Sequence, residues 1–259
     1  MSRIYILFAD EPVFHPNMLR VIALARPGDL VGVGAVRHRA GAEGRLAYYR
    51  KQFSFWGPKG FAVNATSVAM HALLGGAPLP VALKGFHSLR AVSRAHGIPF
   101  RIVDDVNEPA FVEFLKGQEL DVIVSSQGQI FRPRLLAASR LACINRHSSL
   151  LPQYGGLKPV FWAMLHGEAE VGVSVHVMEE AIDRGRVLAQ IRVRADSGKG
   201  LYELYKDVFD VSGTAILRAL DVLEGNGSAP SMDDSSPSYF REPSASDIRR
   251  FRQLGNRMA

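Results

Sequence analysis

An asparagine and a histidine lie two residues apart near the middle of the chain, and both side chains could take part in acyl-transfer chemistry. Asn145 ends the apolar run LACIN (141–145), and His147 follows it. If a strand persists through residue 147, the spacing places both side chains on one face. A histidine can act as a general base near neutral pH, and an amide can donate a hydrogen bond to a developing oxyanion. The pair therefore suits a reaction through a tetrahedral intermediate.

A carboxylate farther along the chain could complete this set. Asp183 precedes Gly185 in a turn, where it could orient His147, raise its basicity and relay a proton. Each residue also has an ordinary structural interpretation. Asn145 could cap a turn, His147 could fill a polar corner of the core, and Asp183 could simply form the turn. The sequence leaves both interpretations open, because it does not show that the two loops meet.

The elements that would position these residues follow from the hydrophobic pattern. We expect strands at residues 3–8, 30–36, 99–103, 121–126, 141–145, 171–178 and 186–193. We expect helices at 12–25, 65–74, 87–96, 108–116, 160–166, 201–223 and 244–255, with a helix and loop of undefined course over 37–60. This alternation predicts an α/β, Rossmann-like fold with a mainly parallel sheet flanked by helices. In such sheets ligands bind at the carboxyl ends of strands, where Asn145 lies.

Composition excludes several classes of site. The chain has 259 residues, of which 47% are hydrophobic, enough for one large α/β domain with a small appendage. A single cysteine, Cys143, rules out an internal disulfide and a cysteine-built zinc site, and the histidines lack metal-ligand spacing. No apolar stretch approaches the roughly 20 residues that cross a bilayer, and the run 4–9 is too short for a signal peptide. We therefore expect a cytoplasmic protein without a metal or a membrane partner.

The net charge does not identify a partner. It is +6 at pH 7, which could suit nucleic acid or a phosphorylated small molecule. The basic residues are nevertheless scattered, and the two densest groups, within 37–51 and 249–257, are explained by solvated helix faces.

The stretch 144–190 resembles the signature of the folate-dependent formyltransferase family. It reads INRHSSLLPQYGGLKPVFWAMLHGEAEVGVSVHVMEEAIDRGRVLAQ. The family pattern is Asn-x-His, Ser-Leu-Leu-Pro, Gly-Val-(Ser/Thr)-Val-His and an acidic turn with Asp-x-Gly, all present here in that order. The similarity extends from about Asp121 to Leu223 and is looser on either side. It implies a catalytic domain of the formyltransferase type over 1–225, with a loop and short helical C-terminal extension over 226–259.

The resemblance also implies a donor, an acceptor and three roles. The donor would be 10-formyltetrahydrofolate and the acceptor an amine. Asn145 would hold the formyl oxygen, and His147 would take part in proton transfer and oxyanion stabilisation. Asp183 would tune the histidine and help to remove a proton from the attacking nitrogen.

By the same resemblance, a pterin pocket lies between the loop after the preceding strand and the acidic turn. The corresponding residues here are Gln127, Gly128, Gln129, Ile130, Phe131, Leu151, Met178, Glu179, Glu180, Ala181 and Ile182. Gly128 would allow close backbone approach, while Ile130 and Phe131 would supply apolar walls. Their alternative role is ordinary core packing. His176, in mid-strand opposite a valine face, is interpreted as structural rather than catalytic.

Departures from the family pattern narrow the choice of acceptor. Members that formylate initiator methionyl-tRNA usually carry an arginine where this chain has Gly155, and a C-terminal barrel for which the residues after 223 are too few. Members that formylate phosphoribosyl glycinamide carry a glycine-rich loop after the first strand, which binds phosphate at a helix N-terminus. This chain has ADEPVF there, and Asp10 and Glu11 would repel a phosphate, though they could attract a cationic amine.

A small-molecule amine acceptor remains, and no nucleic-acid partner is expected. An amino-sugar nucleotide is favoured over hydroxyornithine or another amino-acid-like amine. The alternative reaction is hydrolysis of 10-formyltetrahydrofolate, in which water replaces the amine. The sequence does not give the oligomeric state, and a homodimer is compatible with it.

Overall fold

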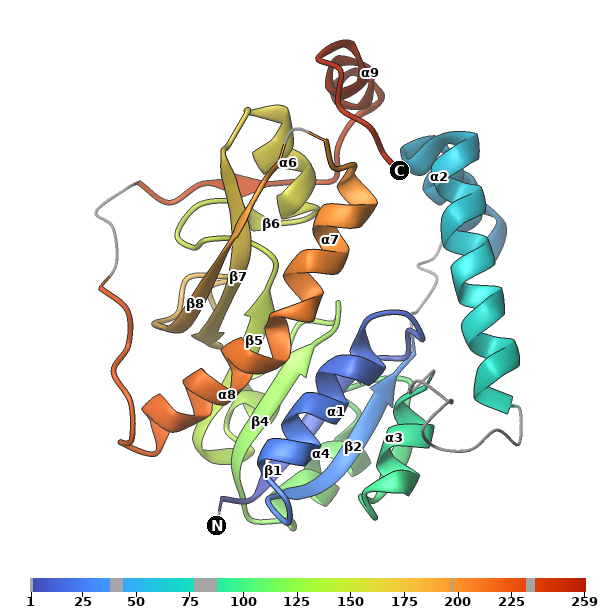
Figure 1. The fold of residues 1–259 in the computed structure, drawn as a ribbon. Coiled ribbons are helices and arrows are strands. Elements are labelled where there is room, and N and C mark those ends of the chain that lie inside the picture. Colours follow the sequence, from blue (N-terminus) through green and yellow to red (C-terminus); the bar gives the residue numbers. More distant parts are fainter. Residues whose placement is uncertain (1, 38–43, 77–87, 197, 232–235) are drawn as a thin grey trace.

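A seven-stranded sheet with helices on both faces forms the body of the molecule (Figure 1). The computed structural model describes residues 2–37, 44–76, 88–196, 198–231 and 236–259. The expected α/β architecture is confirmed, although the parts of the predicted elements that fall on 38–43 and on residue 87 lie outside the described residues. None of the helices in the described ranges is long and apolar enough to cross a membrane.

The sheet is mainly parallel, with strand order β3-β2-β1-β4-β5-β7-β8. Strands β1 to β5 run parallel, and β7 is antiparallel to both of its neighbours. The strands are β1 (Ile4–Ala9), β2 (Leu30–Val36), β3 (Phe100–Val103), β4 (Leu120–Ser126), β5 (Ser139–His147), β7 (Glu170–Val177) and β8 (Val187–Arg194). The order reverses between β1 and β4, and such a switch point is where open α/β sheets bind ligands.

Helices cover the sheet on both sides. They are α1 (His15–Ala25), α2 (Gly44–Gly76), α3 (Leu89–Ala95), α4 (Pro109–Lys116), α5 (Pro133–Leu136), α6 (Pro159–Leu165), α7 (Leu201–Asp210), α8 (Ser212–Leu223) and α9 (Ala245–Gln253). Helices α1 and α8 lie in front of the sheet in Figure 1, and α4 packs on the opposite face.

Strand β5 separates two hydrophobic cores. Cys143 packs into the core on the α4 side, and its neighbour Ile144 packs into the core on the α1–α8 side. Because side chains alternate along a strand, Asn145 and His147 continue the first face, while Arg146 continues the second.

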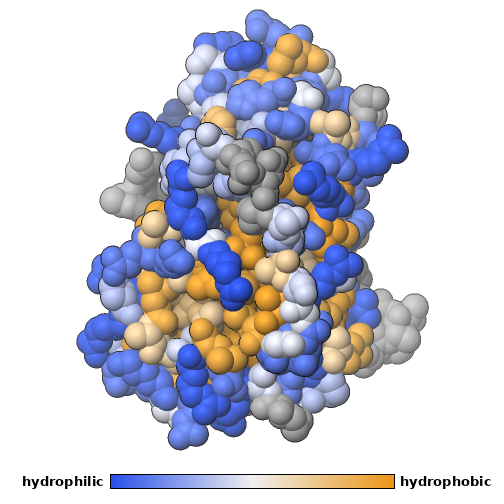
Figure 2. Space-filling view, turned by 90° about the vertical axis from the view of Figure 1, so that its left-hand side faces the viewer, coloured by the Kyte–Doolittle hydropathy of each residue, from blue (hydrophilic) through white to orange (hydrophobic). Residues whose placement is uncertain are grey.

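Strand β8 is an edge of the sheet, and its outer end is charged. Arg192 and Arg194 are exposed, and Arg192 pairs with Glu170 at 2.9 Å. Figure 2 shows the side of the molecule that carries the β7–β8 edge, with apolar residues gathered in the middle and polar residues around them. Charged side chains on an edge strand oppose pairing with another chain.

The segment expected to be a helix and loop, with a separate helix over 65–74, is helical throughout its described part. Two helical stretches meet inside α2 at a kink, where Gly57 has φ +70° and Pro58 follows. Glycine and proline both interrupt regular helix, which accounts for the kink at this point.

The predicted helix 201–223 is broken at Val211 into α7 and α8. Ser212 Oγ donates a hydrogen bond to the carbonyl of Val208 at 2.6 Å, and Arg146 Nε donates to the same hydroxyl at 2.8 Å. A serine that bonds back to the preceding turn can bend a helix, which accounts for the break. The guanidinium of Arg146, from β5, is bonded to the same serine.

The C-terminal segment packs into the main core. Strand β9 (Tyr239–Phe240) pairs in parallel with β6 (Gly155–Gly156), a two-stranded sheet that the sequence did not predict. Helix α9 begins with the expected capping box at Ser244, and Phe251 is fully buried with its ring stacked on Phe161 at 4.6 Å between centroids.

Replacing Phe251 by alanine should lower the free energy of unfolding by about 3–5 kcal/mol, because a fully buried ring leaves the core. Leu254→Ala, at the C-cap just after the same helix, is the control. Its side chain is 58% exposed, and the expected change is within about 0.5 kcal/mol. Urea unfolding followed by circular dichroism measures both, and equal effects would contradict the packing of α9 described above.

Candidate active site

The end of β5 holds the asparagine and histidine on one face. The strand persists to His147, as the spacing argument required. Asp183, in the turn after β7, brings its Oδ1 to 3.7 Å from His147 Nδ1. The two loops therefore meet, and the three residues singled out from the sequence are neighbours.

The protonation of His147 is fixed by a backbone carbonyl. Its Nε2 lies 2.9 Å from the carbonyl oxygen of Tyr154, so Nε2–H donates and Nδ1 is left to face Asp183. Burial lowers the pKa of His147 below its ordinary value, although the Asp183 carboxylate acts in the opposite direction. The neutral ring therefore offers Nδ1 as a base.

Asp183 is held as an anion. Its backbone is in the left-handed region at φ +55°, and its Oδ2 accepts a hydrogen bond from the Gly156 N–H at 2.8 Å. Burial alone would raise the pKa of this carboxyl. The adjacent His176, the nearby His147 and the Gly156 N–H together lower the pKa to about 2.

His176, interpreted from the sequence as structural rather than catalytic, lies in the same cluster. Its Nδ1–H donates to the Val177 carbonyl at 2.8 Å, and its Nε2 lies 3.4 Å from Asn145 Nδ2 and 3.5 Å from Asp183 Oδ1. His176 pairs directly with Asn145 in the β5–β7 register. The signal that could have revealed it is this register, which the hydrophobic pattern does not fix for two strands buried on both faces.

A cavity of about 360 Å³ opens beside these four residues. Of the predicted pterin-pocket residues, nine line it: Gln127, Gly128, Gln129, Ile130, Phe131, Met178, Glu179, Ala181 and Ile182. Sequence reasoning missed five further residues of the wall: Ser125, Gly156, Leu157, His176 and Tyr239. Three of these come from elements whose pairing is long-range, so local patterns carried no signal for them.

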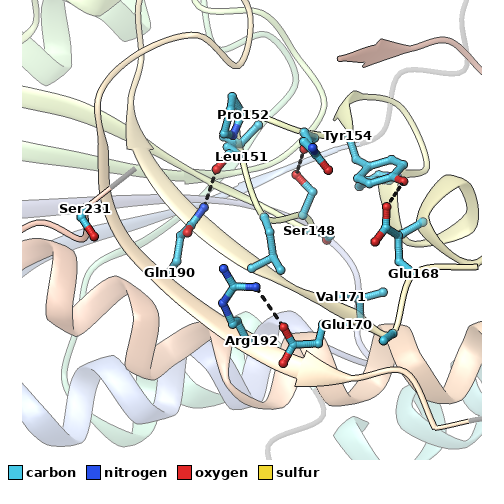
Figure 3. A pocket seen from close by; sticks show the side chains of 16 residues that line it. Ser148, Leu151, Pro152, Tyr154, Glu168, Glu170, Val171, Gln190, Arg192 and Ser231 are labelled. Atoms are coloured by element: carbon cyan, nitrogen blue, oxygen red, sulfur yellow. Dashed lines mark hydrogen bonds and ion pairs between the residues drawn. The ribbon is translucent and has the colours of Figure 1, made fainter. Parts of the chain in front are cut away.

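Two predicted residues lie elsewhere. Glu180 does not line this cavity and is exposed. Leu151 lines a separate cavity of about 260 Å³ behind the loop 148–154, where Gln190 Nε2 donates to the Leu151 carbonyl at 2.6 Å (Figure 3). That loop carries the Tyr154 carbonyl, so Leu151 supports the site from behind.

The loop after β4 is shaped by its own side chains. Gln127 Nε2 donates to the Gln129 carbonyl at 2.7 Å, and Gln129 Nε2 donates to the Asp104 carbonyl at 2.9 Å. A Cβ added at Gly128 would meet nothing within 4 Å, so the backbone there is open to close approach. Ile130 is 64% exposed, whereas Phe131 is buried in the core behind the loop.

The turn just before α1 is held by the chain's own carboxylate. Glu11 accepts hydrogen bonds from the N–H groups of Val13 at 2.6 Å and Phe14 at 2.9 Å, and His15 Nδ1 lies 3.2 Å from it. Free N–H groups at such a helix start are what a phosphate would require. Among the described residues, no group of three or more histidine, cysteine or acidic side chains is arranged to hold a metal ion.

Comparison with known proteins points to one family. Residues 95–220, just under half of the chain, match the family model described as "Formyl transferase". The methionyl-tRNA formyltransferase of Thermotoga maritima is 32% identical over 165 residues, 63% of this chain and 50% of that protein. The corresponding enzyme of Chlorobium chlorochromatii is 30% identical over 148 residues, 57% of this chain and 47% of that protein. The chain thus spans about half the length of the curated relatives it matches.

Solved structures with the same fold include two kinds of formyltransferase. A sugar N-formyltransferase from a Shewanella species has a TM-score of 0.58 at 16% identity, covering 97% of this chain and 88% of its own. Glycinamide ribonucleotide transformylase 1 from Symbiobacterium toebii has a TM-score of 0.58 at 19% identity, covering 87% and 89%. At these identities the likeness concerns the fold, which is of the formyltransferase type expected from the sequence.

The electrostatics predict how His147 titrates. Its pKa should lie below about 6.5, the ordinary histidine value. Asp183→Asn should lower it further, because the carboxylate that favours the imidazolium is removed. Ring-¹⁵N NMR between pH 4 and 8, assigned with His147→Gln, measures both values. Glu179→Gln, on the same turn, is the control and should leave the pKa unchanged. An unchanged or raised pKa in Asp183→Asn would contradict the assigned contact.

Proposed function

We propose that this chain, whose residues 95–220 are of the formyltransferase enzyme family, transfers a formyl group from 10-formyltetrahydrofolate to a primary amine of a small molecule. An amino-sugar nucleotide is the favoured acceptor. One observation carries the proposal. Asn145, His147 and Asp183 converge beside a cavity walled by the predicted loops 127–131 and 178–182.

The cavity suits a flat heterocycle. Its volume of about 360 Å³ is in the range of small-molecule sites, roughly 300–1,000 Å³. Ile130 and Ile182 offer exposed apolar surface at its rim, and Gly128 leaves the backbone accessible. The donor, when bound, supplies a formyl group on nitrogen.

Asn145 is oriented to stabilise negative charge on the formyl oxygen. One of its Nδ2–H groups faces His176 Nε2 at 3.4 Å, which sets the direction of the amide. The second Nδ2–H remains free to donate to the oxygen as charge develops. A donor fixed in place before the reaction stabilises the transition state without reorganising.

His147 and Asp183 are arranged to remove a proton from the attacking amine. Nδ1 of His147 is the basic nitrogen, and the imidazolium that forms keeps a partner on each side, the Tyr154 carbonyl and the Asp183 carboxylate. Because the pKa of Asp183 is about 2, this carboxylate is an anion throughout the neutral range and stabilises the new positive charge.

Two local features support a small acceptor. A Cβ at Gly155 would lie 3.2 Å from the Ser238 carbonyl oxygen and 3.5 Å from Asp183 Cβ, so the arginine usual in the tRNA branch would crowd the β6–β9 pair. Glu11 binds the N–H groups of Val13 and Phe14 just before α1, so a phosphate of the glycinamide substrate would meet a carboxylate there. Both features favour a different amine.

The test is incubation with 10-formyltetrahydrofolate, with and without a pool of primary amines, followed by mass spectrometry. Tetrahydrofolate and one formylated amine should appear together, and only when the amine is present. His147→Ala and Asp183→Asn should slow this release severely while the folded-state spectra stay unchanged. Formate released equally without any amine would instead identify a 10-formyltetrahydrofolate hydrolase.

A pair of variants separates chemistry from donor binding. Asn145→Ala should lower kcat by about 10²–10³-fold, because it removes a hydrogen bond that strengthens in the transition state, and should leave the folate Kd nearly unchanged. Ile182→Ala, on the cavity rim, should weaken folate binding and spare kcat. Turnover kinetics and folate calorimetry give both quantities. A pure loss of folate affinity in Asn145→Ala would exclude the oxyanion role.

A further inference from the structure

The imidazole of His147 has two acceptors for a single proton. In the neutral ring only one nitrogen carries a hydrogen. Nε2 lies 2.9 Å from the Tyr154 carbonyl oxygen, and Nδ1 lies 3.7 Å from the Asp183 carboxylate. A carboxylate beside Nδ1 favours a proton on that nitrogen, as the aspartate of a serine protease does. The closer approach of the Tyr154 carbonyl keeps the proton on Nε2, because 3.7 Å is too long for a hydrogen bond.

The Tyr154 carbonyl belongs to an uncommon backbone conformation. Tyr154 has φ +57°, in the left-handed region, which costs free energy for a residue with a side chain. Such a conformation persists only where the surrounding contacts hold it. The N–H of Tyr154 donates to Ser238 Oγ at 2.9 Å, and its ring stacks on Phe240 with 5.4 Å between centroids. The direction of the carbonyl therefore depends on the contacts that hold this tyrosine.

Glu168 holds the far end of the same side chain. The phenol of Tyr154 donates to Glu168 Oε1 at 2.6 Å, a short hydrogen bond to a carboxylate (Figure 3). Such bonds are roughly twice as strong as those between neutral groups. Burial and the Glu168 carboxylate both raise the pKa of Tyr154 above its ordinary value, so the phenol keeps its proton and remains the donor. His166 Nδ1 lies 3.3 Å from the phenol oxygen, but an imidazole has no negative charge to strengthen a bond to it.

Glu168 itself lies outside the reaction site. It is an exposed residue in the turn between α6 and β7, and it does not line the donor cavity. Together with Tyr154 it lines the cavity of about 260 Å³ behind the loop 148–154. Glu170 lines the same cavity but pairs with Arg192 at 2.9 Å (Figure 3). Glu168 is thus the carboxylate of this cavity that reaches the reaction site through one intervening residue.

We infer that Glu168 is a positioning residue for His147. By holding the Tyr154 phenol it fixes the direction of the Tyr154 carbonyl, and that carbonyl keeps the imidazole proton on Nε2. The consequence for turnover rests on the proposed function, whereas the position of the proton is a property of the free protein. Without Glu168 the carbonyl turns away more easily, and the Asp183 carboxylate draws the proton to Nδ1. The nitrogen that should accept a proton from the amine then already carries one.

The test reads the tautomer of His147 directly. Long-range ¹H–¹⁵N NMR at pH 8, where burial keeps this ring neutral, distinguishes the protonated ring nitrogen from the bare one, and His147→Gln gives the assignment. The unmodified chain should show the proton on Nε2. Glu168→Ala should populate the Nδ1–H form, and Tyr154→Phe, which removes the hydroxyl but keeps the ring, should do the same. Because the contacts to Ser238 and Phe240 remain, we expect a mixture of the two tautomers in both variants.

Two further variants control for charge and packing. Glu168→Gln keeps an acceptor for the phenol and should retain mostly the Nε2–H form. Glu170→Ala removes a carboxylate from the same cavity but leaves the bond between Tyr154 and Glu168 in place, so it should match the unmodified chain. Persistence of the Nε2–H form in both Glu168→Ala and Tyr154→Phe would overturn the inference. An equal shift in Glu170→Ala would overturn it as well.

Turnover gives a second readout. Glu168→Ala and Tyr154→Phe should lower kcat by about ten- to a hundredfold, the loss typical when a partner that orients a metal-bound histidine is removed, and should leave the folate Kd unchanged. A loss of kcat without a change of tautomer would contradict the positioning role. A shifted tautomer in variants of a chain that formylates no amine would support the positioning role and contradict the proposed transfer.

Discussion

The carboxylate of Asp183 is the contact on which the site depends. It accepts the N–H of Gly156 and lies beside two histidines, so it joins the turn after β7 to the end of β5 and to the small β6–β9 sheet. Because several positive or hydrogen-donating groups surround it, the carboxyl stays ionised although burial opposes this.

Local hydrophobic periodicity predicted most of the secondary structure. The strands of the main sheet, most of its helices and the shared face of Asn145 and His147 follow from spacing alone, and the structure has them. The pairing of Gly155 with Tyr239 was not predictable, since these residues are far apart in sequence and each short strand has only two residues. The place of His176 depended on the β5–β7 register, which a strand buried on both faces does not reveal.

The two-residue period of β5 divides the chemistry between its faces. Asn145 and His147 point to the side of the donor cavity, while Arg146 points to the side of α7. The two candidate catalytic side chains therefore share one face, and the arginine between them packs on the other. The guanidinium of Arg146 bonds to Ser212 at the break between α7 and α8. The break brings a hydroxyl to the guanidinium without supplying a carboxylate that would neutralise it.

The segment before the first helix differs from a glycine-rich phosphate loop in its charge. In a glycine-rich loop, the N–H groups at the start of the first helix are free and bind an anion. Here Glu11 lies just before the helix and binds the N–H groups of Val13 and Phe14, so an external phosphate would be repelled by its carboxylate.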